Sequence, residues 1–322
     1  MKNLTLLVIA SANDPYLPML EPLRSRATIH IAPDTEGLAP FAANADALLA
    51  WAPKRAELEK FLPLAPKLQW IHLRWAGLDS TLFPALVESP VPLSNARGVY
   101  SQSLAEFVIL GALYFSKNVP RLLEAQKAHK WEVFTVGELR GATIGIAGYG
   151  DIGRACAQRA HAMGMRVLAM RRRPALSESD PSIDRVYPRE SLIEMIRECD
   201  YVVAAAALTP ETKGMIGDPE FAAMKPEAIV MNVGRGPLIN EAAMIRALQS
   251  GKIRGAALDV FEVEPLPADS PLWDMPNVLL SPHCTDNTPT WNEESMQFFI
   301  RNFEHFEKGE HIENIVDKHA GY

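Results

Sequence analysis

An arginine, a glutamate and a histidine stand in polar segments that follow predicted strands. Arg235 is flanked by glycines, Glu264 precedes a proline, and His283 follows one. A guanidinium can bind a carboxylate and polarise a carbonyl, and an imidazole exchanges protons near neutral pH. A carboxylate that holds the imidazole favours its protonated form. With a hydride donor, these side chains could reduce a 2-keto acid, because the reaction needs a cation for the substrate and an acid for the developing alkoxide.

A glycine-rich turn could bind the hydride donor. The strand candidate 142–147 precedes the turn and the helical stretch 154–163 follows it. In G-x-G-x-x-G order the turn contains Gly148, Tyr149, Gly150, Asp151, Ile152 and Gly153. The first glycine permits a tight bend, the second lets the backbone approach a pyrophosphate, and the third lets the helix pack on the strand. The helix N-terminus attracts the anion. In this strand–turn–helix context the motif predicts a dinucleotide site.

The end of the next predicted strand bears on which dinucleotide binds. An NAD site normally has an acidic residue there, but 170–174 contains three arginines and no carboxylate. Since guanidinium groups bind phosphate bidentately, Arg171, Arg172 or both could hold the 2′-phosphate of NADP. The alternative is a solvated basic turn that accepts either cofactor. We predict that NADP(H) is preferred and that NAD(H) is possible.

Short apolar runs alternate with longer helical patterns, which predicts β-α-β units. The first candidate strands are Thr5–Ala10, Ala27–Ile31, Ala47–Ala50, Leu68–Leu73 and Val91–Ser94. A long buried helix is predicted over Ser101–Phe115. Further candidate strands are Ala142–Ala147, Arg166–Met170, Tyr201–Ala206, Ile229–Val233, Ala256–Leu258 and Val278–Leu280. An aromatic stripe between Trp291 and Phe306 predicts a helix that packs in the core, rather than one that binds a partner.

Composition limits the partners. The 322 residues carry 32 basic and 39 acidic side chains, a formal net charge of −7. We therefore expect no nucleic-acid partner, because the chain has no overall positive field. We expect no membrane span, since no apolar run approaches about 18 residues. The N-terminal run 4–10 imitates a signal peptide, but its shortness and the turn residues after it favour a buried strand.

The cysteines are Cys156, Cys199 and Cys284. Their spacing fits neither a disulfide framework nor a zinc site, so we predict no metal and a cytoplasmic location. Cys284 next to His283 could be a nucleophile. Adjacent residues on an extended chain point to opposite faces, which disfavours that interpretation.

Four motifs occur in the order typical of the D-isomer-specific 2-hydroxyacid dehydrogenase family. They are the glycine-rich turn, N-x-x-R-G from Asn232, D-V-F-x-x-E-P-L from Asp259, and P-H ending at His283. The chain resembles this family, in its glyoxylate/hydroxypyruvate reductase-like branch, over essentially its whole length. The resemblance implies an α/β fold of two doubly wound parallel-sheet domains and a homodimer. A Rossmann dinucleotide-binding domain, 99–285, would be inserted into a flavodoxin-like substrate-binding domain, 1–98 and 286–322.

The resemblance also implies residue roles. Arg235 would bind the substrate carboxylate and carbonyl oxygen, His283 would donate the proton in reduction, and Glu264 would hold the imidazole. Asp259 would face the nicotinamide end of the cofactor. Asn232 and Val233 would also bind the cofactor.

The segment 74–79 matches the substrate loop of the family. The backbone N–H groups around Ala76 and Gly77 would receive the substrate carboxylate, because small residues leave room for an anion. Trp75 would shape the pocket, and core packing is the alternative role.

The predicted reaction is hydride transfer between a nicotinamide and C2 of a small 2-keto or D-2-hydroxy acid. Glyoxylate and hydroxypyruvate are the first candidates. An alternative is a dinucleotide-sensing interaction protein that resembles the C-terminal binding protein corepressors, which share the fold. The lack of long disordered tails disfavours it. The segment 284–286 departs from the family pattern, which bears on substrate fit rather than on reaction type.

Overall fold

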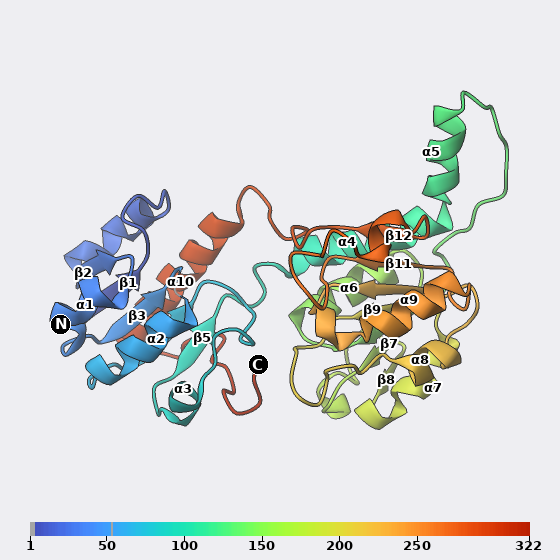
Figure 1. The fold of residues 1–322 in the computed structure, drawn as a ribbon. Coiled ribbons are helices and arrows are strands. Elements are labelled where there is room, and N and C mark those ends of the chain that lie inside the picture. Colours follow the sequence, from blue (N-terminus) through green and yellow to red (C-terminus); the bar gives the residue numbers. More distant parts are fainter. Residues whose placement is uncertain (1–3, 53) are drawn as a thin grey trace. The chain divides into compact units, whose positions relative to one another are not determined.

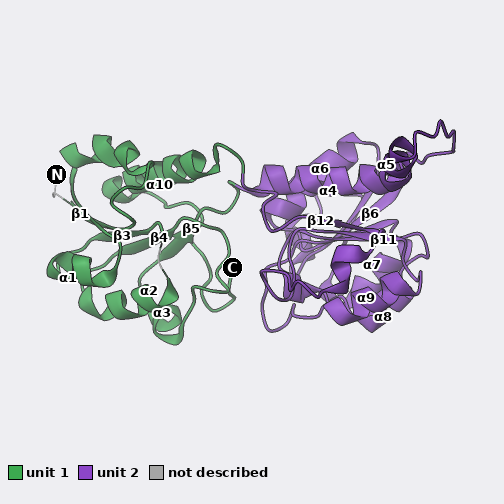
Figure 2. Ribbon diagram, turned by 45° about the horizontal axis from the view of Figure 1, so that its top comes forward, with its two compact units in different colours: residues 1–99, 288–322 green, residues 100–287 purple. Residues whose placement is uncertain are grey.

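The structure is a computed structural model that describes residues 4–52 and 54–322. It divides into two compact units, residues 1–99 with 288–322 and residues 100–287 (Figures 1 and 2). The boundaries expected from the sequence, 98/99 and 285/286, lie close to the observed ones at 99/100 and 287/288. Each unit has its own parallel sheet, so the predicted two-domain α/β fold is confirmed. Residues 1–3, which precede the run compared with a signal peptide, lie outside the described residues.

The first unit is built on a five-stranded sheet in the order β2-β1-β3-β4-β5. Its strands are β1 (Leu4–Ile9), β2 (Ala27–Ala32), β3 (Ala47–Ala50), β4 (Trp70–Leu73) and β5 (Leu93–Asn95). Its helices are α1 (Thr35–Ala42), α2 (Arg55–Phe61), α3 (Pro84–Glu88), α10 (Trp291–Lys308) and the 3₁₀ segments η1 (Leu17–Ser25) and η2 (Leu62–Leu64). All of its paired strands are parallel.

Both faces of this sheet are covered by helices, and its central strands β1 and β3 are therefore mostly apolar and buried. Along β1, Leu7 and Ile9 pack in the cluster that contains residues of α1, α2 and α3. Leu6 and Val8 point to the other side, into the cluster with η1 and α10. Figure 2 shows α10 on one side of this sheet and α1, α2 and α3 on the other.

The aromatic residues of α10 belong to the core of the first unit, as predicted. Met296, Phe299 and Phe303 are fully buried. Trp70 on β4 stacks on Phe299, with 5.5 Å between the ring centroids. The end of the chain thereby completes the domain that its beginning starts.

The second unit is built on a seven-stranded sheet in the order β12-β11-β10-β9-β6-β7-β8. Its strands are β6 (Thr143–Ala147), β7 (Arg166–Met170), β8 (Arg185–Tyr187), β9 (Tyr201–Ala204), β10 (Ile229–Asn232), β11 (Gly255–Leu258) and β12 (Val278–Leu280). The chain builds outward from β6 to β8, then crosses to β9 on the other side of β6. This reversal makes the carboxyl end of β6 a topological switch point, where ligands bind in open α/β sheets.

Helices cover both faces of the second sheet as well. The covering helices are α4 (Ser101–Ser116), α6 (Asp151–Ala162), α7 (Leu192–Glu198), α8 (Asp218–Ala223) and α9 (Glu241–Gln249), and a further helix, α5, spans Val119–Lys127. Short 3₁₀ turns are η3 (Pro174–Leu176), η4 (Arg189–Ser191), η5 (Gly236–Leu238) and η6 (Pro271–Asp274). Figure 2 shows α4 and α6 on one face of the sheet and α7, α8 and α9 on the other. The helix α4 packs so closely on the sheet that a Cβ on Gly111 would lie 2.8 Å from the Cβ of Ala257.

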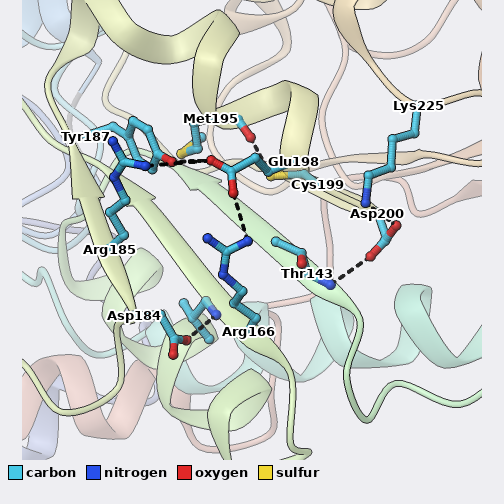
Figure 3. A network of polar contacts seen from close by, with 11 residues as sticks. Thr143, Arg166, Asp184, Arg185, Tyr187, Met195, Glu198, Cys199, Asp200 and Lys225 are labelled. Carbon is cyan, nitrogen blue, oxygen red and sulfur yellow. Dashed lines mark hydrogen bonds and ion pairs between the residues drawn. The ribbon is translucent and has the colours of Figure 1, made fainter.

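A charged network holds together the amino ends of the strands in this sheet (Figure 3). Glu198, at the end of α7, accepts hydrogen bonds from Tyr187 and, at 2.8 Å, from Arg166. Asp200 accepts from the backbone N–H of Thr143 at 2.8 Å and pairs with Lys225 at 2.7 Å. The network therefore stabilises the sheet at the edge opposite the strand carboxyl ends.

The strand β8 and the helix α5 were not predicted from the sequence. The edge strand β8 is only three residues long and begins with an exposed arginine, so it carries no apolar run. The helix α5 has no buried residue and, with the segment after it, projects from the second unit (Figure 1). Within 4–52 and 54–322, no helix has the length and apolar character that crossing a bilayer requires.

Candidate active site

The glycine-rich turn follows β6 and begins α6. Gly148 has φ +111°, and a Cβ there would lie 2.4 Å from the backbone nitrogen of Ala206. A Cβ on Gly153 would lie 2.3 Å from the carbonyl oxygen of Gly148. In contrast, a Cβ on Gly150 would meet no described atom within 4 Å. Gly148 and Gly153 are thus required by packing, while Gly150 leaves open space directly before the N-terminus of α6.

This open space fits a dinucleotide pyrophosphate, which is bound by backbone N–H groups at a helix N-terminus. Tyr149 is buried, Ile152 is half-buried, and Asp151 is the exposed first residue of α6.

The arginine corner directly follows β7. The backbone of Arg171 pairs with Tyr187 on β8 at 3.0 Å, and its guanidinium donates to the Ser177 hydroxyl. The side chains of Arg172 and Arg173 are exposed. Both ends of the expected dinucleotide site, the glycine turn and the arginine corner, therefore lie at the carboxyl ends of neighbouring strands.

The turn that carries Arg235 is built by Asn232. This residue ends β10 and is 1% exposed. Its side-chain oxygen accepts from the Gly234 N–H at 3.2 Å, and its Nδ2 donates to the carbonyl of Arg235 at 3.0 Å. Val233 is also buried, and its N–H donates to Ala204. The side chain of Asn232 thus shapes the turn, and direct cofactor contacts of Asn232 and Val233 stay predictions.

The Arg235 turn lies against the segment that carries Glu264. Gly236 approaches the chain so closely that a Cβ would lie 1.8 Å from the carbonyl oxygen of Phe261. Glu264 in turn accepts the Phe261 N–H through Oε1 at 3.0 Å. Arg235 is half-buried, with Nη1 2.9 Å from the carbonyl of Gly234.

His283 and Glu264 form a direct hydrogen bond, with Nδ1 and Oε2 2.7 Å apart. Their side chains are 39% and 35% exposed, so solvent and ligands can reach the pair. His283 has φ +52°, a left-handed conformation that is uncommon outside glycine and that collects at functional sites. The two residues that the sequence assigns to one imidazole–carboxylate pair are therefore in contact.

Asp259 supports the backbone that follows His283. It directly follows β11, is fully buried, and accepts the N–H groups of Cys284 and Thr285 through Oδ1 at 3.1 and 3.2 Å. Its Oδ2 has no hydrogen-bond partner among the described residues. Ser103 on α4 also binds this segment, through the carbonyl of Thr285. The structure gives Asp259 a role in holding the histidine loop, and its place at the nicotinamide end stays a prediction.

Asp286 is a site residue that the sequence did not reveal as functional. Burial, followed by the Asp259 carboxylate, raises its pKa, while His283 and Arg235 act in the opposite direction. A carboxyl group at this place adds to the charge around the histidine. Its only signal in the sequence is its departure from the family pattern.

The predicted substrate loop lies in the first unit, after β4. Asn95 Nδ2 donates to the carbonyl of Ala76 at 2.7 Å, which holds the loop against β5. Ala76 and Gly77 are both half-buried. Trp75 donates to Thr81 at 3.3 Å and is half-buried, so it is not a fully packed core residue.

Arg74, directly before this loop, is surrounded by tryptophans that the sequence did not connect. Its guanidinium carbon lies 4.9, 5.6 and 5.1 Å from the ring centroids of Trp51, Trp75 and Trp291. Ser295 on α10 donates to the Arg74 carbonyl at 2.8 Å. Cation–π contacts of this kind fix the guanidinium, so Trp75 helps to order its own loop.

Comparison with known proteins decides the family. The family model described as D-isomer specific 2-hydroxyacid dehydrogenase, NAD binding domain, matches residues 109–285. The chain belongs to this family. It is therefore an oxidoreductase. This result disfavours the alternative of a dinucleotide-sensing, corepressor-like interaction protein.

Relatives of the chain include both curated enzymes and solved structures. Glyoxylate/hydroxypyruvate reductase B of Yersinia pestis is 38% identical over 238 residues, 71% of this chain and 72% of that protein. A D-isomer specific 2-hydroxyacid dehydrogenase from Xanthobacter autotrophicus, solved with NADPH and MES, has a TM-score of 0.85 at 30% identity and covers both chains fully. An NADPH-dependent glyoxylate/hydroxypyruvate reductase from Sinorhizobium meliloti, solved with NADP and sulfate, has a TM-score of 0.81 at 25% identity, again over all of both chains.

Proposed function

We propose that the protein reduces small 2-keto acids, with glyoxylate and hydroxypyruvate as the first candidates and NADPH as the preferred hydride donor. The hydrogen bond between His283 and Glu264 carries the proposal, because it prepares an imidazole as a proton donor. The names of the reductases to which the chain is similar support the choice of substrates.

The catalytic roles follow from the chemistry of three side chains. Nδ1 of His283 is hydrogen-bonded to Glu264. Nε2 is therefore the nitrogen that exchanges a proton with the substrate. Arg235 binds the carboxylate and the carbonyl oxygen of the keto acid, which polarises C2 for attack. Bound NADPH supplies the hydride that adds to C2. The proton from Nε2 completes the hydroxyl group, and the reverse proton transfer serves oxidation.

The glycine turn and the arginine corner would hold the cofactor. The N–H groups around Gly150 bind the pyrophosphate, and Arg171 with Arg172 binds the 2′-phosphate. Two structures to which the chain is similar contain NADPH or NADP, which supports this preference. Ala76 and Gly77 would present backbone N–H groups to the substrate carboxylate.

We also propose that the protein is a cytoplasmic homodimer. All three cysteines are free, and burial raises the pKa of Cys156 and Cys199 to about 12, as expected for unreactive thiols in a reducing compartment. Apolar side chains are exposed on α5 and the following segment, among them Trp131 at 94% and Val133 at 86%. An ordered projection with exposed apolar residues is typical of a protein interface. Sedimentation equilibrium of the wild type and of Trp131→Ala tests the dimer: a monomeric wild type contradicts it.

Steady-state kinetics test the function. The purified protein is given NADPH or NADH with glyoxylate, hydroxypyruvate, pyruvate or phenylpyruvate, and kcat/KM is compared across the panel. We expect turnover with NADPH and either glyoxylate or hydroxypyruvate. A preference for NADH would make the arginine corner a solvated turn, and no turnover with either cofactor would reject the proposed function.

A further inference from the structure

The segment between β7 and β8 is fastened to the glycine-rich turn by one carboxylate. Oδ2 of Asp180 accepts hydrogen bonds from the Tyr149 hydroxyl and from Nε of Arg154, both at 3.0 Å. Oδ1 accepts the backbone N–H of Ser182 at 3.0 Å. Tyr149 belongs to the turn itself and Arg154 to the first turns of α6, so Asp180 joins two segments about 30 residues apart in the chain.

The carboxylate is buried and charged. The side chain of Asp180 is 6% exposed, whereas that of Arg154 is 61% exposed. Burial alone favours the neutral acid, but the hydrogen bonds from Ser182, Arg154 and Tyr149 outweigh it and lower the pKa of Asp180. A buried charge persists only when it is paired and hydrogen-bonded. This contact is therefore an internal anchor rather than a chance surface pair.

The anchored segment also holds the arginine corner. The guanidinium of Arg171 donates to the hydroxyl of Ser177, which is 3% exposed. The Asp180 N–H donates to the carbonyl of Ser177 at 3.1 Å. A continuous path of contacts thus runs from Arg171 through Ser177 and Asp180 to Tyr149.

We propose that Asp180 is a positioning residue for cofactor selection, which holds the arginine corner at a fixed distance from the glycine-rich turn. In NADP the pyrophosphate and the 2′-phosphate are separated by a covalent framework, so a site that binds both must present its two halves at a matching separation. Ordering those halves before binding removes an entropic cost that would otherwise weaken the complex. The inference rests on the proposed preference for NADP, because it concerns the loop that would bind the 2′-phosphate.

Two nucleotide fragments separate this role from general stability. Adenosine 2′,5′-bisphosphate carries the 2′-phosphate, and ADP carries the pyrophosphate without it. Asp180→Asn is the informative variant, because both carboxylate oxygens accept hydrogen bonds and an amide has only one oxygen. We expect calorimetric binding of the bisphosphate to weaken about 10-fold, with ADP binding unchanged, an energy of about 1.4 kcal/mol. In kinetics, KM for NADPH should rise by a similar factor while kcat and the KM for NADH stay at their wild-type values.

Matched variants control for changes of charge and folding. Glu178→Gln makes the same change in the same segment at an exposed position, and it should leave both affinities unchanged. Arg154→Met removes one donor to Asp180 from an exposed side chain, and we expect a smaller loss in the same direction. Circular dichroism and thermal melting show whether each variant folds. If Asp180→Asn does not fold, the affinity of Arg154→Met for the bisphosphate tests the proposal instead.

Each outcome is informative. Wild-type affinity of Asp180→Asn for the bisphosphate, or tighter binding, would overturn the proposal. So would an equal loss for both fragments, because it indicates general damage to the domain. A wild-type protein that does not prefer the bisphosphate over ADP would reject the NADP preference itself, and this result is distinguishable because it does not depend on any variant.

Discussion

Nδ1 of His283 lies 2.7 Å from Oε2 of Glu264, and the other oxygen of the same carboxyl group accepts the N–H of Phe261 at 3.0 Å. Both oxygens of Glu264 are thus used, one to fix the carboxylate and one to fix the imidazole. The tautomer and orientation of a catalytic histidine depend on such a partner.

Replacement of Glu264 by Gln should lower kcat about 10²-fold, because the amide keeps the size of the side chain but removes the charge that stabilises an imidazolium. The pH profile of kcat should change with it, while binding of the dinucleotide stays unchanged. Glu262→Gln, an exposed carboxylate two residues away, is the matched control. Wild-type turnover of Glu264→Gln would contradict the assigned role.

The glycines of the dinucleotide turn should respond differently to alanine. Gly150→Ala adds a methyl group in open space, so the protein should fold with little change in stability and bind the dinucleotide more weakly. Gly153→Ala places a Cβ against the Gly148 carbonyl, which should destabilise the fold by about 1–3 kcal/mol. Chemical unfolding and cofactor titration of both variants measure the two effects. Equal behaviour of the two variants would contradict the packing argument.

Asp286 should make stability depend on pH. Its pKa is raised above the ordinary 3.8, so its contribution to stability is fully present below that value and is lost as the pH rises through the folded-state pKa. Asp286→Asn should therefore have a higher Tm than the wild type near pH 7, and the difference should shrink as the pH is lowered toward about 4. Melting curves across this range provide the measurement. A constant difference at every pH would show that titration of Asp286 is not its cause.

Glu198 should affect stability and leave catalysis unchanged, because it lies at the amino ends of the strands (Figure 3). Glu198→Gln removes the charge that pairs with Arg166, which should cost about 1 kcal/mol and lower Tm by about 2–4 °C. Glu194→Gln, an exposed change on the same helix, should have no effect. An altered KM for the cofactor in Glu198→Gln would contradict the separation of the two strand edges.

Local patterns predicted most of the strands and both sheets, because a buried parallel strand is a short apolar run between turn residues. The run 166–170 is such a case, and the observed strand has the same bounds. The edge strand β8 was not predicted, because its three residues begin with an exposed arginine and form a strand only by pairing with β7.

Contacts between distant side chains were the part that could not be predicted. The pairing of Asp180 with Tyr149 and the tryptophans around Arg74 join residues far apart in the sequence. No spacing rule connects such positions, because their proximity depends on how loops pack after the sheets form. The pairing of Glu264 with His283 was predicted only because two motifs of a family carry them.

The most direct test of the proposed reaction is turnover of keto acid by His283→Asn with NADPH. We expect kcat to fall about 10²–10⁴-fold relative to the wild type, while the dissociation constant of NADPH, measured by its fluorescence on binding, stays unchanged. Turnover at the wild-type rate would contradict the assignment of His283 as the proton donor.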